Sequence, residues 1–346
     1  GTCVLRGCVP KKFLVYASEY SQAFRDAKGF GWTVDWARFD WPTLRDTVQT
    51  EVNRLSGLYI KNLDAAGVRI IEDRAVLTDA HTIRLTREGR YMTAERILVA
   101  TGGHTYRPEE TPGQELGITS TDAFLLDELP SSIVIAGGGF IALEFANIFA
   151  NLGVETTIVY RGERLLRGFD HDVRMHVQAD YERAGVKVIC GSTISEIAPL
   201  SGNRKLVTLS NTMRLEADQV MWAVGRTPNT HGLGLEAAGV KLSERGAVIV
   251  DEYSRSSVPS IWAVGDVTDR INLTPVAIRE AVAFVETEFH QRPTKFEHKD
   301  VASAVFSSPP VGAVGLSEQD ARMQGHKLKI FRTVFRPMKN ILAGNE

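Results

Sequence analysis

The chain has 346 residues, which at about 150 residues per domain indicates two or three domains. Its 40 Lys and Arg residues nearly balance 42 Asp and Glu residues, and the formal net charge is −2. Proteins that bind nucleic acid or an anionic membrane surface typically carry an excess of basic residues, so this balance argues against both of those functions. The hydrophobic content of 43% is that of a folded globular protein.

The chain begins with Gly1 and is already inside a cysteine motif, so we expect an internal piece of a longer protein. Three cysteines are too few for a disulfide framework. Cys3 and Cys8 lie close together, which favours a redox pair in a reducing compartment. Cys190 is far away and is predicted to be a small buried side chain.

The first part of the chain predicts two helices, at residues 10–27 and 41–66. Residues 68–100 then alternate between apolar and polar side chains, which predicts a run of strands with turns at Asp79 and at Glu88–Gly89. The run begins with Val68 and Ile70 and ends in an Ala-Thr-Gly-Gly segment.

The centre of the chain predicts a strand, a glycine turn, a helix and a second strand over residues 133–160. Three consecutive glycines and Glu144 within residues 131–153 argue against a membrane span there. Further strands are predicted at 187–190, 219–224 and 261–264, with helices at 172–183 and from Pro275. Strand, glycine and helix in repeated succession indicate an α/β architecture.

The first chemical motif is Gly-Thr-Cys-Val-Leu-Arg-Gly-Cys-Val-Pro-Lys-Lys over residues 1–12. On an ideal helix, Cys3 and Cys8 would point in different directions, so pairing requires a break that Gly7 permits. Pro10 and Lys11 suit the start of a helix, which would favour a thiolate at Cys8. Two unrelated thiols or two metal ligands are the alternatives, and no second Cys/His pair has ligand spacing.

The second motif is Gly-Gly-Gly-Phe-Ile-Ala over residues 137–142, which matches the G-x-G-x-x-G/A dinucleotide fingerprint. A strand before it and a helix after it supply the required context, with a pyrophosphate expected at the helix N-terminus. Residues 232–237 match the same pattern without a preceding apolar strand, and we interpret them as a turn that enters a helix.

The end of the second strand indicates which dinucleotide binds. An NAD site would carry an acid about 20 residues after the fingerprint, and Tyr160 stands there instead. Arg161, Arg164 and Arg167 follow and could bind a 2′-phosphate, so the sequence favours NADP(H) over NAD. The alternative is that these arginines form only a solvated basic loop, and their position at the end of the strand argues against it.

The third motif is Gly265-Asp266 after an apolar strand, followed by Thr274-Pro275 at a predicted helix start. The aspartate could bind a ribityl hydroxyl, and the helix could direct its positive end at a flavin ring. The alternative is an aspartate that only caps a turn.

Together and in this order, the motifs resemble the pyridine nucleotide–disulfide oxidoreductases. The resemblance extends through Gly-Arg-Thr-Pro-Asn at 225–229 and Val-Phe-Ser-Ser-Pro-Pro at 305–310. Pro-Lys-Lys after Cys8 is similar to glutathione, trypanothione and large thioredoxin reductases. Val-Leu-Arg-Gly between the cysteines is most similar to bacterial and plant glutathione reductases.

The resemblance implies two Rossmann-like domains, for FAD and NADPH, with a discontinuous FAD domain. It places an N-terminally truncated FAD domain at 1–103, an NADPH domain at 104–228, the return of the FAD domain at 229–298, and the start of an α+β dimerisation domain at 299–346. The implied reaction is the NADPH-dependent reduction of glutathione disulfide, which maintains the cellular thiol pool.

The resemblance also implies residue roles. Cys3 would attack the substrate and Cys8 would lie next to the flavin, while Lys11 and Glu144 would be an ion pair beside its reactive nitrogen. Phe140 would cover the nicotinamide pocket, and Tyr59 would contact the substrate. The expected cofactor contacts are Thr2, Cys3, Cys8, Lys11, Thr101, Gly102, Gly137, Gly139, Phe140, Ile141, Ala142, Glu144, Arg161, Arg167, Gly225, Arg226, Gly265, Asp266, Leu273, Thr274 and Pro275.

Some features depart from the family pattern. Leu5 replaces the usual Asn or Ile, and Val282 stands where some members bind glutathione through Arg. The family's upstream flavin fingerprint and its C-terminal His-Pro are absent from these 346 residues. Trypanothione or thioredoxin reduction, and a non-catalytic NADP-binding protein, are the alternatives. The expected partner is a second copy, with no nucleic acid, membrane or metal. The expected location is the cytoplasm, or an organelle if a targeting sequence precedes Gly1.

Overall fold

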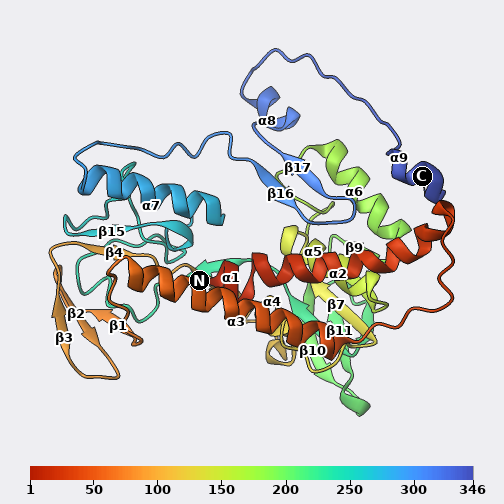
Figure 1. Cartoon of the computed structure of the whole chain (residues 1–346), viewed down its shortest axis with the longest axis horizontal. Coiled ribbons are helices and arrows are strands. Elements are labelled where there is room, and N and C mark those ends of the chain that lie inside the picture. The colour runs from red at the N-terminus through yellow and green to blue at the C-terminus, as the bar shows by residue number, and fades with distance from the viewer. Residues whose placement is uncertain (346) are drawn as a thin grey trace. The chain divides into compact units, whose positions relative to one another are not determined.

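The computed structural model describes residues 1–345, and these form two compact units whose elements are labelled in Figure 1. Unit 1 contains Gly1–Cys3, Ser56–Tyr106 and Arg226–Lys299. Unit 2 contains Val4–Leu55, Arg107–Gly225 and the chain from Asp300 onward.

Unit 2 is built on a five-stranded parallel sheet with the order β6-β13-β7-β8-β9. The bounds are Ile118–Thr119, Gln219–Trp222, Ser132–Ala136, Glu155–Tyr160 and Lys187–Cys190 for β6, β13, β7, β8 and β9. Helix α5 (Phe140–Asn151) joins β7 to β8, and α6 (His171–Arg183) joins β8 to β9. The strand–helix–strand unit predicted over residues 133–160 is therefore confirmed.

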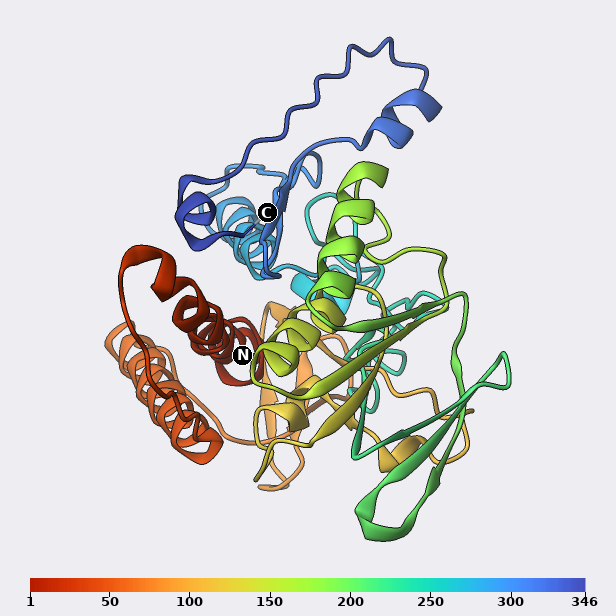
Figure 2. The ribbon, with the colours of Figure 1, turned by 90° about the vertical axis from the view of Figure 1, so that its right-hand side faces the viewer.

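Long helices cover this sheet because their apolar stripes need a partner. Helix α2 (Cys8–Asp26) packs against α5, and the two lie side by side in Figures 1 and 2. Helix α3 (Trp41–Ala65) contributes Val48 and Val52 to the same core, where Leu14 of α2 is also buried. The helices predicted at 10–27 and 41–66 are thus confirmed, with their ends displaced by at most two residues.

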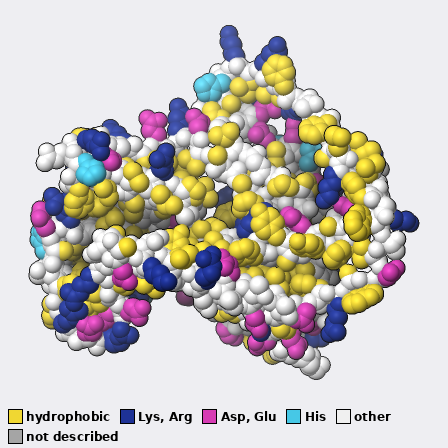
Figure 3. Space-filling view, viewed as in Figure 1, with side chains coloured by type: hydrophobic (Ala, Val, Ile, Leu, Met, Phe, Trp, Pro, Cys, Tyr) yellow, Lys and Arg dark blue, Asp and Glu magenta, His cyan; other side chains and the backbone are white. Residues whose placement is uncertain are grey.

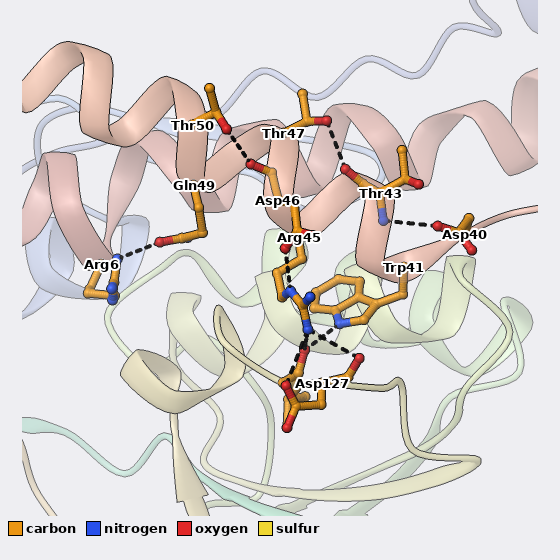
Figure 4. A network of polar contacts seen from close by, with 11 residues as sticks. Arg6, Asp40, Trp41, Thr43, Arg45, Asp46, Thr47, Gln49, Thr50 and Asp127 are labelled. Carbon is orange, nitrogen blue, oxygen red and sulfur yellow. Dashed lines mark hydrogen bonds and ion pairs between the residues drawn. The ribbon is translucent and has the colours of Figure 1, made fainter.

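Polar contacts fix the first half of α3 within unit 2 (Figure 4). The Trp41 indole Nε1 donates to the Leu126 carbonyl at 2.7 Å, and the Arg45 guanidinium donates to the Asp127 carboxylate at 3.3 Å. The Arg6 guanidinium donates to the Gln49 side chain at 3.1 Å. These bonds tie the cysteine-bearing end of the chain to α3.

Shorter elements complete unit 2. A three-stranded antiparallel sheet is inserted in the chain between β9 and β13, a hairpin lies nearer the C-terminus, and short helices accompany these strands. They are α1 (Thr2–Arg6), η1 (Ala27–Phe30), η2 (Gln114–Leu116), α4 (Ser120–Ala123), β10 (Ile194–Pro199), η3 (Ser201–Asn203), β11 (Lys205–Leu209), β12 (Arg214–Ala217), β16 (Ser303–Val305), β17 (Val311–Ala313), α8 (Glu318–Met323) and α9 (Met338–Ala343), where α1 spans the boundary of the units. Along α2, Tyr16, Tyr20 and Phe24 remain exposed, and Figure 3 shows hydrophobic side chains gathered over this part of the unit.

Unit 1 contains a parallel pair, β4 (Ile97–Val99) with β15 (Ile261–Ala263), and a three-stranded meander. The meander is β1 (Ala75–Leu77), β2 (Thr82–Leu85) and β3 (Tyr91–Thr93); β5 (Gly103–Thr105) pairs with β14 (Arg226–Pro228), and η4 (Gly265–Thr268) and α7 (Thr274–Glu288) follow β15. Its core includes Leu77, Val99, Leu235 and Ile261.

Two local predictions are wrong. Val68 and Ile70 are not in a strand, and the first strand of that run is β1. Residues 232–237 form turns without entering a helix, because Gly232 and Gly234 adopt φ angles of +68° and +71°. A Cβ on Gly234 would lie 2.0 Å from the Leu77 carbonyl oxygen, so this turn is shaped by close packing on β1.

Residues 131–153 form β7 and α5 rather than a membrane span. Within residues 1–345, no helix combines the length and the apolar character needed to cross a membrane.

Candidate functional site

The glycine turn between β7 and α5 has the geometry that a dinucleotide requires. Gly137 has a φ of +134°, and a Cβ there would lie 2.2 Å from the Ala223 carbonyl oxygen, so only glycine fits. At Gly139 an added Cβ would meet no heavy atom of the described residues within 4 Å, which leaves open space at the N-terminus of α5. Ala142 is fully buried and allows the helix to approach the sheet. A pyrophosphate fits this open position, where α5 presents backbone N–H groups.

Tyr160 ends β8 and fills the position of the acid found in NAD sites. Its ring lies against the backbone on both sides: a Cβ on Gly138 or on Gly162 would approach ring atoms to 2.4 Å or 2.6 Å. Arg161 and Arg167 follow in an exposed loop, and neither forms an ion pair with a carboxylate of residues 1–345. Their positive charges are therefore available to an anion beside the dinucleotide.

The remaining residues predicted to contact NADPH lie in the first turn of α5 and after β13. Phe140 is 43% exposed and follows Gly139 directly, whereas Ile141 is half-buried. Gly225 follows β13 with a φ of +143° and is exposed.

Lys11 and Glu144 form a buried ion pair between α2 and α5. The Lys11 Nζ lies 2.8 Å from the Glu144 Oε1, and the two residues are 7% and 2% exposed. The Phe306 backbone N–H donates to the same carboxylate oxygen at 2.9 Å, and the Phe306 ring lies 3.9 Å from the Lys11 Nζ. Burial lowers the pKa of Lys11, and attraction to Glu144 and Cys8 opposes that shift.

The two motif cysteines lie in consecutive helices. Cys3 is half-buried in α1, after the exposed Thr2, and Cys8 is exposed as the first residue of α2. Gly7 breaks the helix between them with φ −150° and ψ −124°. The predicted break in the helix is therefore present, and a thiolate at Cys8 would benefit from the N-terminus of a 19-residue helix. The pairing of these cysteines stays a prediction.

Unit 1 gathers the predicted flavin residues around one turn. Asp266 follows Gly265, and its carboxylate lies 3.6 Å from the Arg226 Nε. Arg226 also donates to the Gly103 carbonyl. The Thr101 hydroxyl donates to the Asn229 carbonyl at 2.8 Å, and the Asn229 N–H donates to the Gly102 carbonyl at 2.9 Å. The Ala-Thr-Gly and Gly-Arg-Thr-Pro-Asn motifs are thus hydrogen-bonded to each other.

Helix α7 starts beside this turn with an open N-terminus. Leu273 is its N-cap, Thr274 and Pro275 are exposed in the first turn, and no side chain among the described residues caps it. Pro275 has no N–H, and the Val276 and Ala277 N–H groups donate to the Leu273 carbonyl. The Thr274 N–H, the positive end of the helix dipole and the Asp266 carboxylate are the groups that fit a flavin and its ribityl chain.

The structure does not bring all predicted residues into one unit. Cys8, Lys11 and Glu144 belong to unit 2, whereas Thr101, Arg226 and Asp266 belong to unit 1. Tyr59, the predicted substrate contact, is 58% exposed on the part of α3 that belongs to unit 1, and its hydroxyl forms no hydrogen bond within residues 1–345. Among those residues, no three His, Cys, Asp or Glu side chains are placed to hold a metal ion.

Sequence reasoning missed three residues that support these sites. Phe306 holds Glu144 through its backbone, Tyr181 donates to the Leu143 carbonyl at 2.7 Å, and Glu280 accepts from the Gly265 N–H at 2.7 Å. Glu280 had a detectable signal, since it stands on the apolar stripe of α7 with Val276 and Phe284. A backbone donor such as that of Phe306 has no sequence signal.

The chain is similar in sequence to known proteins of one family. The profile of the family "Pyridine nucleotide-disulphide oxidoreductase" matches residues 1–281, and the profile of its dimerisation domain matches residues 301–346. The chain is 44% identical to "Glutathione reductase, chloroplastic/mitochondrial" of Pisum sativum, over 99% of this chain and 62% of the pea protein. It is 42% identical to glutathione reductase of Nostoc sp., over 100% of this chain and 78% of that protein.

Two further similarities are more distant. The chain is 37% identical to trypanothione reductase of Trypanosoma congolense, over 100% of this chain and 73% of that protein. Among solved structures, it is similar to the Cu(II) complex of the HOCl-induced flavoprotein disulfide reductase RclA from Escherichia coli. That similarity has a TM-score of 0.83 and 29% identity, and it covers 93% of this chain and 71% of RclA.

These similarities extend along the whole chain, and they confirm the α/β fold class and the resemblance predicted from the motifs. The chain spans less than two thirds of the pea protein and about three quarters of the other relatives. The chain belongs to the pyridine nucleotide-disulphide oxidoreductase family.

Proposed function

We propose that the protein is an NADPH-dependent flavoenzyme that reduces glutathione disulfide to two molecules of glutathione through Cys3 and Cys8. The observation that carries this proposal is the Lys11–Glu144 pair, 2.8 Å apart. It joins the helix that starts at a redox cysteine to the helix that starts at the dinucleotide turn. One buried contact thus links the place where a nicotinamide binds to the place where a disulfide reacts.

The cofactors are FAD and NADPH. FAD, when bound, passes the electron pair of NADPH to the cysteine pair. Asp266 and the N-terminus of α7 would hold the flavin. The resemblance assigns the Lys11–Glu144 ion pair to its reactive nitrogen. The open position at Gly139 holds the pyrophosphate of NADPH. Arg161 and Arg167 bind its 2′-phosphate.

The residues of this chain carry the exchange with substrate. The Cys3 thiolate attacks one sulfur of glutathione disulfide, and the first glutathione leaves as a thiolate that takes a proton. The Cys8 thiolate then attacks Cys3 in the mixed disulfide, which releases the second glutathione and forms the Cys3–Cys8 bond. Lys11 favours the Cys8 thiolate, because the two groups attract each other electrostatically.

The names of the relatives support the glutathione substrate over trypanothione. The pea and Nostoc relatives are both named glutathione reductase and are 44% and 42% identical, against 37% for the trypanothione reductase. The match of residues 301–346 to a dimerisation domain supports a homodimer. A cytoplasmic location and a role in thiol homeostasis complete the proposal.

The test is NADPH oxidation by the purified flavin-loaded protein with glutathione disulfide, trypanothione disulfide or oxidised thioredoxin. We expect glutathione disulfide to be turned over at least about tenfold more efficiently than the others, a difference of about 1.4 kcal/mol. Equal efficiency with another disulfide would overturn the substrate assignment, and a protein that binds no FAD would overturn the proposed function.

A second variant tests the order of the cysteines. Cys3→Ser should abolish disulfide reduction while rapid flavin reduction by NADPH survives, because Cys3 is needed only for the attack on substrate. Cys190→Ser is the matched control, since Cys190 lies in β9. Loss of flavin reduction in Cys3→Ser would contradict the assigned roles.

A further inference from the structure

Unit 1 holds a buried carboxylate that none of the motifs identified. Glu280 of α7 is only 2% exposed. A buried charge requires compensating partners, and Glu280 has three, which come from three different segments. They are the η4 turn, the loop before α7 and the segment that follows α7.

The three contacts use both carboxylate oxygens. The Gly265 backbone N–H donates to the Glu280 Oε2 at 2.7 Å. The Arg270 guanidinium lies 2.9 Å from the Oε1, and the His298 Nε2 lies 2.6 Å from the same oxygen. The contacts of Arg270 and His298 with the Oε1 therefore offset the cost of burying the carboxylate. The Oε2 accepts the hydrogen bond from the Gly265 N–H in the turn.

The carboxylate of Glu280 accepts a hydrogen bond from the Gly265 backbone, at a point where the chain takes an unusual conformation. Gly265 is buried with a φ of +75°, and a Cβ there would lie 3.1 Å from the Ala277 Cβ, so the turn packs tightly on α7. The Thr268 hydroxyl donates to the Gly265 carbonyl at 2.8 Å, and the Arg270 Nε donates to Thr268 at 3.1 Å. Without Glu280, the Gly265 N–H would be buried with no acceptor in this ring of contacts.

We propose that Glu280 is a positioning residue that holds the Gly265–Asp266 turn in the shape in which Asp266 binds the flavin. This inference rests on the proposed function, because it takes the flavin as the ligand of Asp266. Through His298, the same carboxylate also fixes the segment that leads to the residues matched by the dimerisation domain. Glu280 is not one of the residues assigned to bind the flavin or the substrate, and it acts through its contact with the Gly265–Asp266 turn.

The test compares Glu280→Ala with Glu286→Ala in the flavin-loaded and the flavin-free protein. Glu286 is on the same helix and pairs with His290 and Arg292, outside the turn. Amide hydrogen exchange of Gly265, followed in peptides spanning 261–270, reports on the turn without flavin. We expect Glu280→Ala to raise that exchange about tenfold and to weaken FAD binding about tenfold, because a buried donor loses its acceptor. Glu286→Ala should change neither.

Conservative variants separate positioning from general loss of structure. Glu280→Gln keeps an acceptor for the Gly265 N–H, so it should restore most of the exchange protection. If Glu280→Ala does not fold, Glu280→Asp replaces it, because the shorter side chain no longer reaches the turn, and Glu286→Asp becomes its control. The same Gly265 exchange rate in the Glu280 variant and its control would overturn the inference.

The two proposals can fail separately. A wild-type protein that binds no FAD contradicts the proposed function, yet the exchange rate of Gly265 still tests the contact. A wild-type protein that binds FAD and reduces glutathione disulfide supports the proposed function. If its FAD affinity were then the same in Glu280→Ala and Glu286→Ala, the role of Glu280 would be wrong.

Discussion

The Tyr181 hydroxyl donates to the Leu143 carbonyl at 2.7 Å and thereby joins α6 to α5 one residue before Glu144. Tyr181 is 3% exposed. Burial raises the pKa of Tyr181 well above its ordinary value, and the charge of Glu144 acts in the same direction. The phenol therefore stays protonated in the folded chain at pH values where an exposed tyrosine ionises.

This pKa shift predicts a loss of stability at alkaline pH. Above about pH 10 the unfolded chain releases the Tyr181 proton while the folded chain retains it, so the free energy of unfolding falls as the pH rises. Tyr181→Phe should make that fall shallower, although at neutral pH it costs about 1 kcal/mol for the lost hydrogen bond. Urea unfolding across this pH range measures both effects.

Tyr20→Phe is the control for this prediction, because Tyr20 is 62% exposed on α2. It should leave the free energy of unfolding at neutral pH within about 0.5 kcal/mol of the wild type. Identical alkaline slopes for Tyr181→Phe and the wild type would contradict the prediction.

The Lys11–Glu144 pair predicts strong coupling between two substitutions. Lys11→Met leaves a buried carboxylate without its cation, and Glu144→Gln leaves a buried ammonium without its anion. Each single change should cost about 3–5 kcal/mol, whereas the double variant should cost less than the sum. A double-mutant cycle from urea unfolding gives the coupling energy, and simple additivity of the two costs would argue against a buried pair.

Two glycines of the dinucleotide turn predict opposite results. Gly139→Ala adds a Cβ into open space at φ −89°, so stability should change by only about 0.5 kcal/mol while NADPH binding weakens strongly. Gly137→Ala places a Cβ 2.2 Å from the Ala223 carbonyl oxygen at an unfavourable φ, so it should lower the melting temperature. Thermal unfolding and NADPH titration distinguish them. Unchanged NADPH affinity in Gly139→Ala would remove the pyrophosphate from this position.

The exposed loop that carries Arg161 and Arg167 predicts a preference for NADPH over NADH. The double variant Arg161→Ala with Arg167→Ala should weaken NADPH by at least about 2 kcal/mol and leave NADH nearly unchanged, because only NADPH carries the 2′-phosphate. Steady-state KM values for both cofactors provide the measurement. Arg183→Ala, on the exposed end of α6 and paired with Asp180, serves as the control. Equal weakening of both cofactors would refute the assigned role.

Several features could be predicted because they depend on residues close together in the chain. The apolar strand before Gly137 and the helix after it give a parallel β-α-β unit by local pattern alone. The helices predicted at 10–27 and 41–66 form over Cys8–Asp26 and Trp41–Ala65. The start signal at Pro10 and Lys11 marked the first helix, and apolar spacing marked the second. A local pattern can also mislead, as at Gly232 and Gly234, where packing on β1 keeps a fingerprint-like segment in turns.

The sequence by itself determined the fold class, the cysteine motif and the glycine turn between β7 and α5, because each of these is encoded by neighbouring side chains and glycines. Only the tertiary structure decided what surrounds them. It placed the Phe306 backbone N–H on Glu144, 162 residues away in sequence, and it placed Glu280 beneath Gly265. Such contacts depend on how distant segments pack and on which buried polar groups then need partners, and no pattern along the chain records that.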